Sequence, residues 1–520
     1  MTPPIRLPNV EKVAIIGAGP AGLAAANYLH RYLLAEKTFK RIDIFEQRAR
    51  PGGIWDYKPW TKEKGILPVA KVPQTSPEGE VARAVWGRQR QRQGVGMVVD
   101  GGELDGEGEK EREREKERAE FLSPLYDRLE TNIPRSLMGF SDLEWPASAQ
   151  LFPKHEEVER YLEEYAEEVR HLIRFQTQVV DLRIAGRRGR QAQWRLKTRD
   201  IERGNEGREW EDMYDAVVVA SGHFDVPYIP DIEGIEEWSQ LYPGIISHSK
   251  FYSKPEQFEG QKVIVVGNGA SGLDIANQIM TTCKKPLIQS QRGESYMAAG
   301  PSVDKLEKPE IVEYMPDNRS VRFADGSVET DIDSVLFCTG YFYSFPFLRG
   351  VEPPLIGDGT HVQNLYQHLF CRAHPTLALP ALPQRIIPFP VSEAQGAVIA
   401  RLWSGRLTLP SEAEMEAWEQ NVYRETGGGR DFHLLNFPKD ANYINALYEW
   451  SMSAPEAESK GKKPPYWGEK QRWMRERFPA IKKAFQERGE GRHGVRTLEE
   501  LGFDYEEWRK EKVVEAKSLL

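Results

Sequence analysis

The hydrophobic pattern of this chain places two short apolar runs 250 residues apart, each followed by glycines and then by a helix-like pattern. Val13-Ala-Ile-Ile16 leads into Gly17-Ala-Gly-Pro-Ala-Gly22, and Val263-Ile-Val-Val266 leads into Gly267-Asn-Gly-Ala-Ser-Gly272. A short run without polar residues is typical of a strand buried on both faces of a parallel sheet. The spacing G-x-G-x-x-G allows a tight turn whose backbone N–H groups and following helix N-terminus bind a pyrophosphate. The pattern therefore predicts an α/β fold with two dinucleotide-binding units.

Two further apolar runs, at 215–220 and 333–338, each end in a tight turn and lie on either side of the second unit. They indicate a chain that leaves a first Rossmann-like domain, builds a second one and then returns to the first. The predicted boundaries are 1–225 for the first part of the first domain, 226–331 for the inserted domain, 332–450 for the second part of the first domain, and 451–520 for a helical C-terminal extension.

Other segments have patterns of their own. Residues 71–120 are rich in Gln, Arg, Glu and Gly, so they cannot bury enough apolar surface to offset the entropy of ordering, and they are predicted to form a flexible insertion. Lys154 to Phe175 has apolar residues at helical spacing and predicts an amphipathic helix. The last hundred residues are interpreted as a helical C-terminal cap, with these tryptophans as its core anchors: Trp418, Trp450, Trp467, Trp473 and Trp508.

The first glycine-rich turn has an acid beyond the next strand. Glu46 follows Arg41-Ile-Asp-Ile-Phe45, where a carboxylate accepts hydrogen bonds from ribose hydroxyls and repels a 2′-phosphate. This favours FAD or NAD over NADP. Pro51-Gly-Gly-Ile-Trp55 then offers backbone without side chains beside an aromatic residue, which suits a flat ring system and favours a flavin. The first site is therefore predicted to bind FAD.

The second turn differs at the corresponding position. Beyond Pro286-Leu-Ile-Gln-Ser290 the chain has Gln291 and Arg292 instead of an acid. A guanidinium pairs with a phosphate in bidentate fashion, so Arg292 predicts NADPH at the second site.

Composition narrows the class of protein. The 520 residues carry a net charge of −9 and have no concentrated basic stripe, which argues against nucleic-acid binding. The three cysteines, Cys283, Cys338 and Cys371, form no C-x-x-C pair, so they indicate a reducing, cytoplasmic location and no redox disulfide. No apolar stretch is long enough to span a membrane, and no metal site is predicted. Oligomeric state is left open, with a homo-oligomer compatible with the sequence.

With these sites placed, the sequence resembles the flavin-containing monooxygenases, a family of class B flavoprotein monooxygenases. Tyr242-Pro-Gly244-Ile-Ile-Ser-His248-Ser-Lys-Phe-Tyr252 matches the family signature F-x-G-x-x-x-H-x-x-x-(Y/F), with Tyr242 in place of the first Phe. Phe337-Cys-Thr-Gly-Tyr341 and Ala220-Ser-Gly-His223 resemble the family's A-T-G-Y and A-T-G-H segments. Leu129-Glu-Thr-Asn132 resembles the segment that passes beside the flavin, and its long form is similar to that of fungal members without a membrane anchor.

The resemblance implies roles for particular residues. Asn132 would face the reactive edge of the flavin and the nicotinamide and is the candidate catalytic residue, while Gly244, His248 and Tyr252 belong to the linker signature, with His248 coupling the two domains. The cofactor-binding residues are then predicted to be Gly17, Gly19, Ala21, Gly22, Glu46, Gly53, Ile54, Trp55, Thr131, Asn132, Val179, Gly222, Gly267, Gly269, Ser271, Gly272, Leu273, Asp274, Arg292, Thr339 and Gly340.

The resemblance also implies a reaction. Members of this family use NADPH and O₂ to oxygenate soft nucleophiles such as amines, sulfides and thiols, through a flavin C4a-hydroperoxide. The alternatives are a Baeyer–Villiger monooxygenase, in which Trp usually stands near position 252, and an N-hydroxylating monooxygenase with the same cofactors. A disulfide reductase lacks its cysteine pair here, and a non-catalytic flavoprotein would not need both intact glycine turns together with Arg292.

Overall fold

The computed structural model describes residues 4–7, 10–36, 38–59, 70–77, 79, 119–188, 191–202, 207–293 and 303–518. Most of the predicted insertion at 71–120, namely residue 78 and residues 80–118, lies outside the described residues.

The first glycine-rich turn belongs to a sheet in which β1 (Lys12–Ile16) is flanked by parallel β2 (Arg41–Phe45) and β7 (Ala216–Val219). The strand order in this sheet is β18-β19-β20-β7-β1-β2-β3. Its remaining strands are β3 (Ile173–Arg174), β18 (Leu365–Tyr366), β19 (Phe370–Cys371) and β20 (Leu377–Ala378). Strands that follow the second glycine-rich unit in sequence thus join the sheet of the first unit, as the predicted insertion of one domain into another requires.

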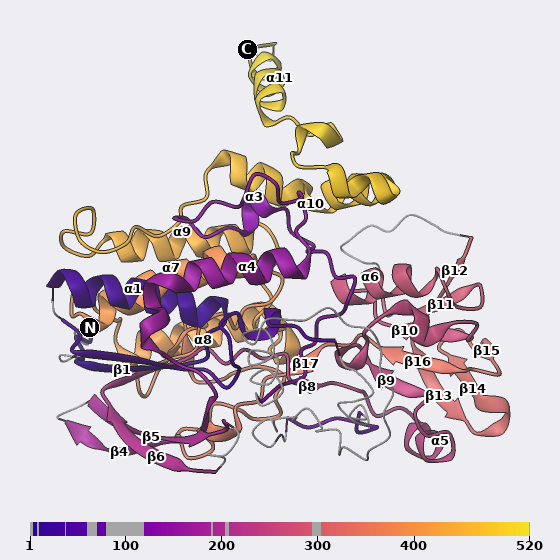
Figure 1. The fold of residues 1–520 in the computed structure, drawn as a ribbon, viewed down its shortest axis with the longest axis horizontal. Helices are drawn as coiled ribbons and strands as arrows, with labels where there is room; N and C mark the ends of the chain where they lie inside the picture. The colour runs from indigo at the N-terminus through magenta and orange to yellow at the C-terminus, as the bar shows by residue number, and fades with distance from the viewer. Residues whose placement is uncertain are drawn as a thin grey trace, which may run out of the picture.

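Alternate residues of β1 contact different layers. Val13 and Ile15 pack in one core with helices α1 (Pro20–Glu36) and α7 (Pro388–Trp403), whereas Ala14 and Ile16 pack in another core with Trp194. This two-residue alternation buries both faces of the strand, which explains why the run has no polar residue. Figure 1 shows the layers, with the helices on one face of the sheet. The opposite face carries the antiparallel sheet of β4 (Thr177–Arg188), β5 (Gln191–Asp200) and β6 (Glu209–Tyr214).

The second glycine-rich turn belongs to a parallel sheet of order β12-β11-β10-β16-β9. Its strands are β9 (Ile246–His248), β10 (Val263–Val266), β11 (Leu287–Ser290), β12 (Lys305–Lys308) and β16 (Ser334–Phe337). Helix α6 (Ala270–Ile279) packs on one face and α5 (Ile235–Leu241) contributes Trp238 to the core on the other. A small antiparallel sheet adds β13 (Ile311–Met315), β14 (Ser320–Phe323) and β15 (Val328–Glu329).

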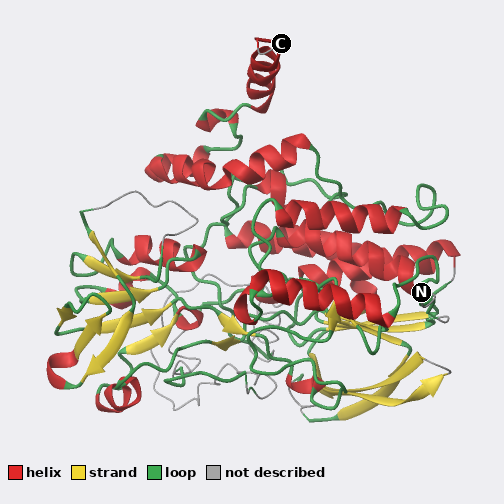
Figure 2. Cartoon of the chain, turned by 180° about the vertical axis from the view of Figure 1, so that it is seen from behind, coloured by secondary structure: helices red, strands yellow, loops and turns green. Residues whose placement is uncertain are grey.

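The two connections between the first and the second nucleotide-binding domain lie side by side. The outgoing β8 (Val226–Pro227) pairs with the returning β17 (Tyr341–Phe342) in an antiparallel ladder. Figures 1 and 2 show this pair at the junction between the two nucleotide-type sheets. The arrangement confirms the predicted α/β fold with two Rossmann-like units. The exact domain boundaries stay a prediction.

The chain ends in helices, most of which cover the first nucleotide-binding domain. These helices are α8 (Glu412–Thr426), α9 (Lys439–Met452), α10 (Glu469–Glu487) and α11 (Tyr505–Ser518). Two shorter contributions come from α3 (Arg135–Met138) and α4 (His155–Ala166). Helix α10 lies against α3, whereas α11 extends away from the body at the end of the chain (Figure 1). Trp467 and Trp473 are buried as predicted for core anchors, while Trp418, Trp450 and Trp508 are half-buried.

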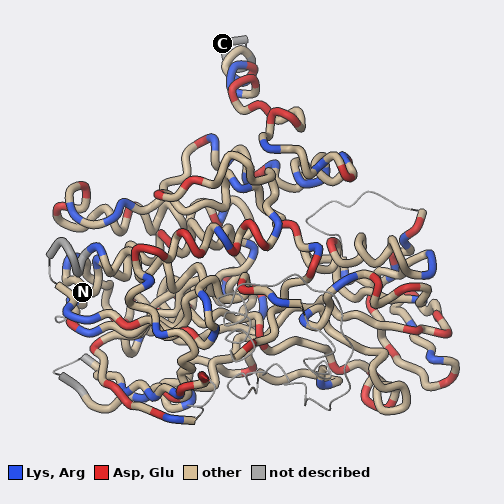
Figure 3. Tube along the Cα trace, viewed as in Figure 1, with Lys and Arg blue, Asp and Glu red and all other residues tan. Residues whose placement is uncertain are grey.

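The predicted helix at 154–175 is shorter than expected. Helix α4 ends at Ala166, a 3₁₀ segment (Glu167–Leu172) follows, and Ile173 then pairs with Ile44 of β2. Sheet pairing of β3 therefore overrides the helical periodicity at the end of this stretch. Acidic and basic residues are both scattered over the described chain (Figure 3). None of the helices in the described part combines the length and the apolar composition needed to cross a bilayer.

Candidate functional site

The first glycine-rich turn is packed too tightly for side chains. Gly17 has φ +101°, and a Cβ there would lie 2.5 Å from the carbonyl oxygen of Ala220. A Cβ on Gly22 would lie 1.9 Å from the carbonyl oxygen of Gly17. These glycines let α1 begin directly above the strand end, so that the first-turn amides, which have no intrahelical acceptor, face the turn. Ala21 lies in this first turn.

Glu46, at the end of β2, is tied to that turn. Its carboxylate accepts hydrogen bonds from the backbone N–H of Ala18 at 2.7 Å and of Arg48 at 2.8 Å. Burial raises the pKa of Glu46, and the two backbone N–H donors oppose that rise. Each carboxylate oxygen keeps a further lone pair, so the group can still accept bonds from two ribose hydroxyls.

The Gly52–Gly53 pair lies directly against the same turn. A Cβ on Gly53, which has φ +60°, would approach the Cα of Gly19 to 3.0 Å. The 3₁₀ turn Gly53–Trp55 follows, and the Ile54 carbonyl accepts a hydrogen bond from the Ser123 hydroxyl at 2.5 Å. The predicted contacts Gly19, Gly53, Ile54 and Trp55 therefore come together around one turn, beside a segment that begins near Ser123.

The second turn repeats this construction with one difference. Gly267 has φ +109°, and a Cβ there would lie 2.7 Å from the Cys338 carbonyl oxygen, while a Cβ on Gly272 would lie 2.3 Å from that of Gly267. Gly269, which precedes α6, has open space where its Cβ would be. An unfilled position over a helix N-terminus is a cradle for a phosphate group. Ser271 is exposed in the first turn of α6, whereas Leu273 is buried.

Arg292 lies just beyond β11, as predicted. Its guanidinium donates to Glu310 at 2.8 Å, and its side chain is 77% exposed. An exposed pair of this kind contributes about 0–1 kcal/mol, so it is easily exchanged for a pairing with a phosphate. Asn268, inside the turn, donates to the Gln291 side chain at 3.0 Å and to the Gly293 carbonyl at 2.6 Å, which holds the region before and after Arg292 close to the glycines.

A segment running from Ser123 to Asn132 joins the two sites. Tyr57, beside the first turn, donates a hydrogen bond to Asp127, and Tyr126 donates to Asp274 of α6 at 2.5 Å. Burial raises the pKa of Asp274, and the charge of Lys482 and the Tyr126 hydrogen bond oppose this. Asp274, a predicted cofactor contact, thus holds this segment against the second body.

Asn132 ends the bridging segment. Thr131 before it is buried; its N–H bonds to the Pro153 carbonyl at 2.9 Å and its hydroxyl to the Ile133 carbonyl at 2.9 Å. Asn132 itself is half-buried, and no residue of the described ranges hydrogen-bonds its side-chain amide. Its amide is therefore available to a ligand, while the backbone that carries it is fixed.

The signature histidine belongs to the second sheet. His248, at the end of β9, is fully buried; its Nδ1 accepts from the Lys250 N–H at 3.1 Å, so Nε2 carries the hydrogen and donates to the Gly340 carbonyl at 3.0 Å. Burial lowers the pKa of His248 to about 3. Gly340 has φ +83° and also accepts from the Tyr228 N–H at 2.9 Å. The neutral His248 thus helps to hold the chain that returns to the first domain at Gly340 against the chain that leaves it at Tyr228.

The other signature and turn residues lie close by. Gly244 and Gly222 have φ +85° and φ +74°. Thr339 donates its hydroxyl to the Tyr228 carbonyl. Tyr252 donates to the Gln278 side chain at 3.0 Å and lies edge-on to Tyr126. Val179 is different, because its side chain packs in the core beneath the first sheet. Its cofactor contact stays a prediction.

Sequence reasoning missed the cations that hold the bridging segment, Ser123 to Asn132, and the two residues before it. Arg48 is buried and donates to the carbonyls of Asp56, Phe121 and Leu122 at 3.2, 3.0 and 3.3 Å. Lys482 of α10 donates to the Thr131 carbonyl at 2.8 Å. A cation whose partner is a backbone carbonyl far away in sequence leaves no local motif, so no signal in the chain could have revealed these contacts.

The donor sets suit two dinucleotides. The first site has a helix N-terminus, an acid for ribose and close-approaching glycine backbone, which fit FAD. The second has a helix N-terminus with open space at Gly269 and an exposed guanidinium, which fit NADPH.

The family model for flavin-binding monooxygenase-like proteins matches residues 111–302 and 305–452, and a model for an NAD(P)-binding Rossmann-like domain matches residues 15–84. A flavin-containing monooxygenase, FMO GS-OX-like 7 of Arabidopsis thaliana, is 32% identical over 80% of this chain and 78% of its own length. The thiol-specific monooxygenase of Saccharomyces cerevisiae is 29% identical over 86% of each chain.

Among solved structures, S-allyl-L-cysteine S-oxygenase from Allium sativum superposes with a TM-score of 0.69 at 28% identity, covering 94% of this chain and 96% of that one. These matches confirm the resemblance to the flavin-containing monooxygenases. The chain belongs to the flavin-binding monooxygenase-like family, enzymes whose cofactors are FAD and NADPH.

Proposed function

We propose that this chain is an NADPH- and O₂-dependent flavin monooxygenase that oxygenates sulfur in small thioethers or thiols. The proposal is carried by the segment from Tyr126 to Asn132, which contacts both glycine-rich sites. Its Asp127 accepts a hydrogen bond from Tyr57 beside the first site, and its Tyr126 donates one to Asp274 in α6 of the second. The Asn132 amide stands at its end without a protein partner among the described residues.

When bound, NADPH and FAD would supply the hydride-transfer and oxygen chemistry of the reaction. The chain's own residues bind and orient. Glu46 would accept hydrogen bonds from the ribose of FAD, Arg292 would pair with the 2′-phosphate of NADPH, and Asn132 would offer its amide to the flavin and the nicotinamide. Tyr126 and Leu129 of this segment pack with Tyr252 in one apolar cluster, which keeps water from the segment.

Sulfur is proposed as the atom oxygenated because two relatives with high coverage are named for sulfur substrates, a thiol and S-allyl-L-cysteine. Sulfur is a soft nucleophile that takes oxygen without help from an acid or base. This suits a junction whose buried histidine is neutral, since burial lowers the pKa of His248 to about 3. Nitrogen oxygenation is the nearest alternative, because an unprotonated amine meets the same requirement.

The test is a substrate panel on the purified, FAD-loaded protein. NADPH-dependent O₂ uptake and product mass would be measured with a thioether, a thiol, a tertiary amine and a cyclic ketone. A mass gain of one oxygen on the thioether or thiol, with little on the amine, supports the proposal. Oxidation of the ketone to a lactone would instead indicate a Baeyer–Villiger enzyme. Absence of flavin absorbance or of NADPH-dependent O₂ uptake would overturn it.

A further inference from the structure

A buried lysine lies on the inner face of helix α10, in the C-terminal extension. The face that α10 buries includes Met474, Phe478, Ile481 and Phe485 at helical spacing, and Lys482 lies on it with 2% of its surface exposed. Its Nζ lies 4.5 Å from the centre of the Phe152 ring and 5.3 Å from that of Phe485. An ammonium in such surroundings is costly unless it is bonded.

The hydrogen bond that Lys482 makes goes to the bridging segment. Nζ donates to the carbonyl oxygen of Thr131 at 2.8 Å, one residue before Asn132. The same peptide unit that carries this carbonyl continues into the N–H of Asn132, so the bond fixes the plane from which the Asn132 side chain departs.

Lys482 also faces charges from two other elements. Burial lowers its pKa, and the carboxylates of Asp274 and Glu130 oppose that change. Asp274 belongs to α6 of the second body and Glu130 to the bridging segment. The ammonium thus lies where the extension, the segment and the second nucleotide domain meet.

The bridging segment is held from both sides around this point. From the extension, Arg492 bonds the Glu130 carboxylate at 3.1 Å. From the second body, Gln278 donates to the Arg128 carbonyl at 3.3 Å. Next to these two contacts, the side-chain amide of Asn132 receives no hydrogen bond from any described residue. A backbone fixed on every side with one side chain left open is preorganised for a ligand.

Packing alone does not explain a lysine at this position. An apolar residue of similar length would fill the space beside Phe152 without the desolvation cost of a buried charge. The carbonyl of Thr131 would then lose the donor that Lys482 supplies, and the peptide between Thr131 and Asn132 would be less restrained. The charge is therefore best explained by the control of that one peptide group.

We propose that Lys482 is a positioning residue, which through the Thr131 carbonyl sets the orientation of Asn132 at the junction of the two nucleotide sites. The inference rests on the proposed function and deepens it. It gives the C-terminal extension a task in the reaction: without the Lys482 bond, reducing equivalents from NADPH are lost to hydrogen peroxide instead of being used on the substrate.

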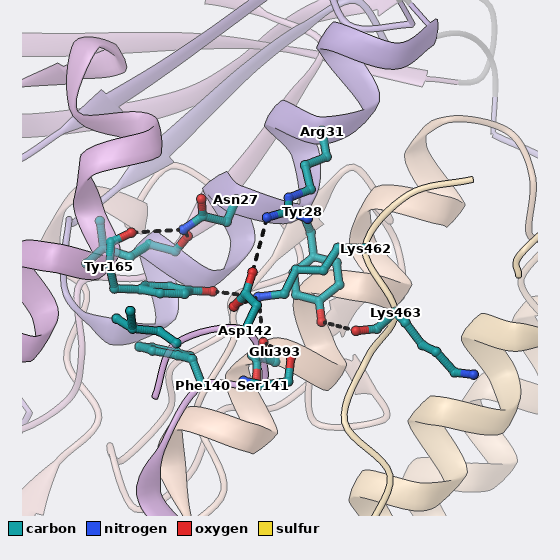
Figure 4. A network of polar contacts seen from close by, with 12 residues as sticks. Asn27, Tyr28, Arg31, Phe140, Ser141, Asp142, Tyr165, Glu393, Lys462 and Lys463 are labelled. Atoms are coloured by element: carbon teal, nitrogen blue, oxygen red, sulfur yellow. Dashed lines mark hydrogen bonds and ion pairs between the residues drawn. The ribbon is translucent and has the colours of Figure 1, made fainter. Parts of the chain in front are cut away.

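The experiment compares Lys482→Met with a matched control, Lys462→Met. Lys462 is an equally buried lysine of the same extension, but its Nζ contacts Asp142 at 2.6 Å and Glu393 at 2.7 Å (Figure 4). Among the described residues, no hydrogen bond or ion pair joins it to 126–132. Both variants remove a buried ammonium that ties the extension to the first domain. Lys482→Arg keeps a donor and tests rescue. Should Lys482→Met fail to retain FAD, Lys482→Leu, which also lacks a donor, replaces it in every measurement.

Two readouts are taken on FAD-loaded protein. The first is product formed per NADPH consumed, which we expect to fall at least about fivefold in Lys482→Met, with hydrogen peroxide rising to match, while NADPH consumption stays within about twofold of wild type. The second is hydrogen exchange of peptides covering 126–136, without substrate or NADPH, which we expect to be about tenfold faster or more. Lys462→Met is expected to show neither change, even where its melting temperature falls as far, and Lys482→Arg to restore much of the coupling.

Equal uncoupling in the two lysine variants would overturn the proposal, because the extension would then act only through stability. Unchanged coupling and exchange in Lys482→Met would also overturn it. Failure of the proposed function is distinguished by the wild-type protein: if it makes no oxygenated product, the function fails, while the hydrogen-exchange comparison still decides whether Lys482 fixes the segment.

Discussion

The carboxylate of Glu46 accepts a hydrogen bond from the backbone N–H of Ala18 at 2.7 Å. The acid that ends β2 therefore holds the glycine-rich turn that follows β1, in addition to offering acceptors to a ribose. Building the turn and binding the cofactor depend on one buried side chain, so changes at Glu46 affect both.

Glu46→Gln is expected to weaken FAD binding about ten- to a hundredfold, because a carboxamide presents one donor nitrogen where two acceptor oxygens are needed and carries no charge. The measurement is FAD affinity by fluorescence titration of the stripped protein. Glu211→Gln, an exposed carboxylate on β6, is the control and should leave the affinity unchanged. Full FAD affinity in Glu46→Gln would show that the carboxylate does not bind the ribose.

Substitutions at Gly269 and at Gly272 should distinguish the binding role of the second turn from its structural role. Gly269 has φ −71° and open space at its Cβ position, so Gly269→Ala should fold normally. The new methyl group would occupy the place of a phosphate, and KM for NADPH should rise about tenfold or more. Gly272→Ala should instead lower stability by about 1–3 kcal/mol or more, because its Cβ would lie 2.3 Å from the Gly267 carbonyl oxygen.

Thermal unfolding and NADPH kinetics on both glycine variants check this prediction. A Gly269→Ala protein with unchanged KM would mean that the dinucleotide does not lie over the N-terminus of α6.

Arg292 is predicted to select NADPH over NADH. Arg292→Gln should raise KM for NADPH about tenfold with little effect on kcat or on the KM for NADH, since only the 2′-phosphate loses a partner. Glu310→Gln should lower the KM for NADPH or leave it unchanged, because it frees the Arg292 guanidinium from its present pairing with Glu310 at 2.8 Å. The matched control is Arg322→Gln, on β14 of the same domain, where Arg322 pairs with Glu313 at 3.3 Å. An unchanged preference for NADPH over NADH in Arg292→Gln would show that the 2′-phosphate does not bind at Arg292.

The sequence was informative wherever function depends on short-range geometry. Both glycine turns, the acid after β2 and Arg292 after β11 could be placed because each is fixed by strand-turn-helix connectivity within about 30 residues. The contacts that join the two sites could not. Lys482 and Thr131 are 351 residues apart, and their bond is formed by packing of α10 that no local pattern encodes.

Local propensity also failed at 154–175. The apolar spacing continues past Ala166, but the chain leaves the helix there to pair Ile173 with Ile44 at the sheet edge. Tertiary pairing decides the end of an element whose periodicity is ambiguous.

Asn132→Ala should separate NADPH oxidation from oxygenation. Removal of the amide should leave hydride transfer largely intact, because the glycine turns, Glu46 and Arg292 hold the two dinucleotides, but it takes away a hydrogen bond at the flavin edge. Product per NADPH should fall about tenfold and hydrogen peroxide should account for the difference. Product and peroxide are quantified from the same reaction. Ser136→Ala, an exposed position on α3, is the control. An unchanged product yield would remove Asn132 from the mechanism.

Because this protein buries neutral histidines, we expect its free energy of unfolding to fall as the pH is lowered below neutral. Burial lowers the pKa of His248 to about 3, whereas an unfolded histidine titrates near about 6.5. Between these values the unfolded state binds a proton that the folded state excludes, so the free energy of unfolding falls as pH falls, by up to about 1.4 kcal/mol per pH unit for each such group. The contribution is fully present above about pH 6.5.

His248→Gln isolates one of these groups. Glutamine can still donate to the Gly340 carbonyl and accept from the Lys250 N–H, so the variant should fold, with a loss of about 1–3 kcal/mol at pH 7 from imperfect geometry. On acidification from pH 6.5 to 4.5 it should lose less stability than wild type, and the two curves should converge. Urea unfolding at several pH values measures this, with Gly269→Ala, which keeps every histidine, expected to run parallel to wild type. Parallel curves for His248→Gln would show that His248 is protonated in the folded protein and that its Nε2 does not serve as a neutral lock between the two connections.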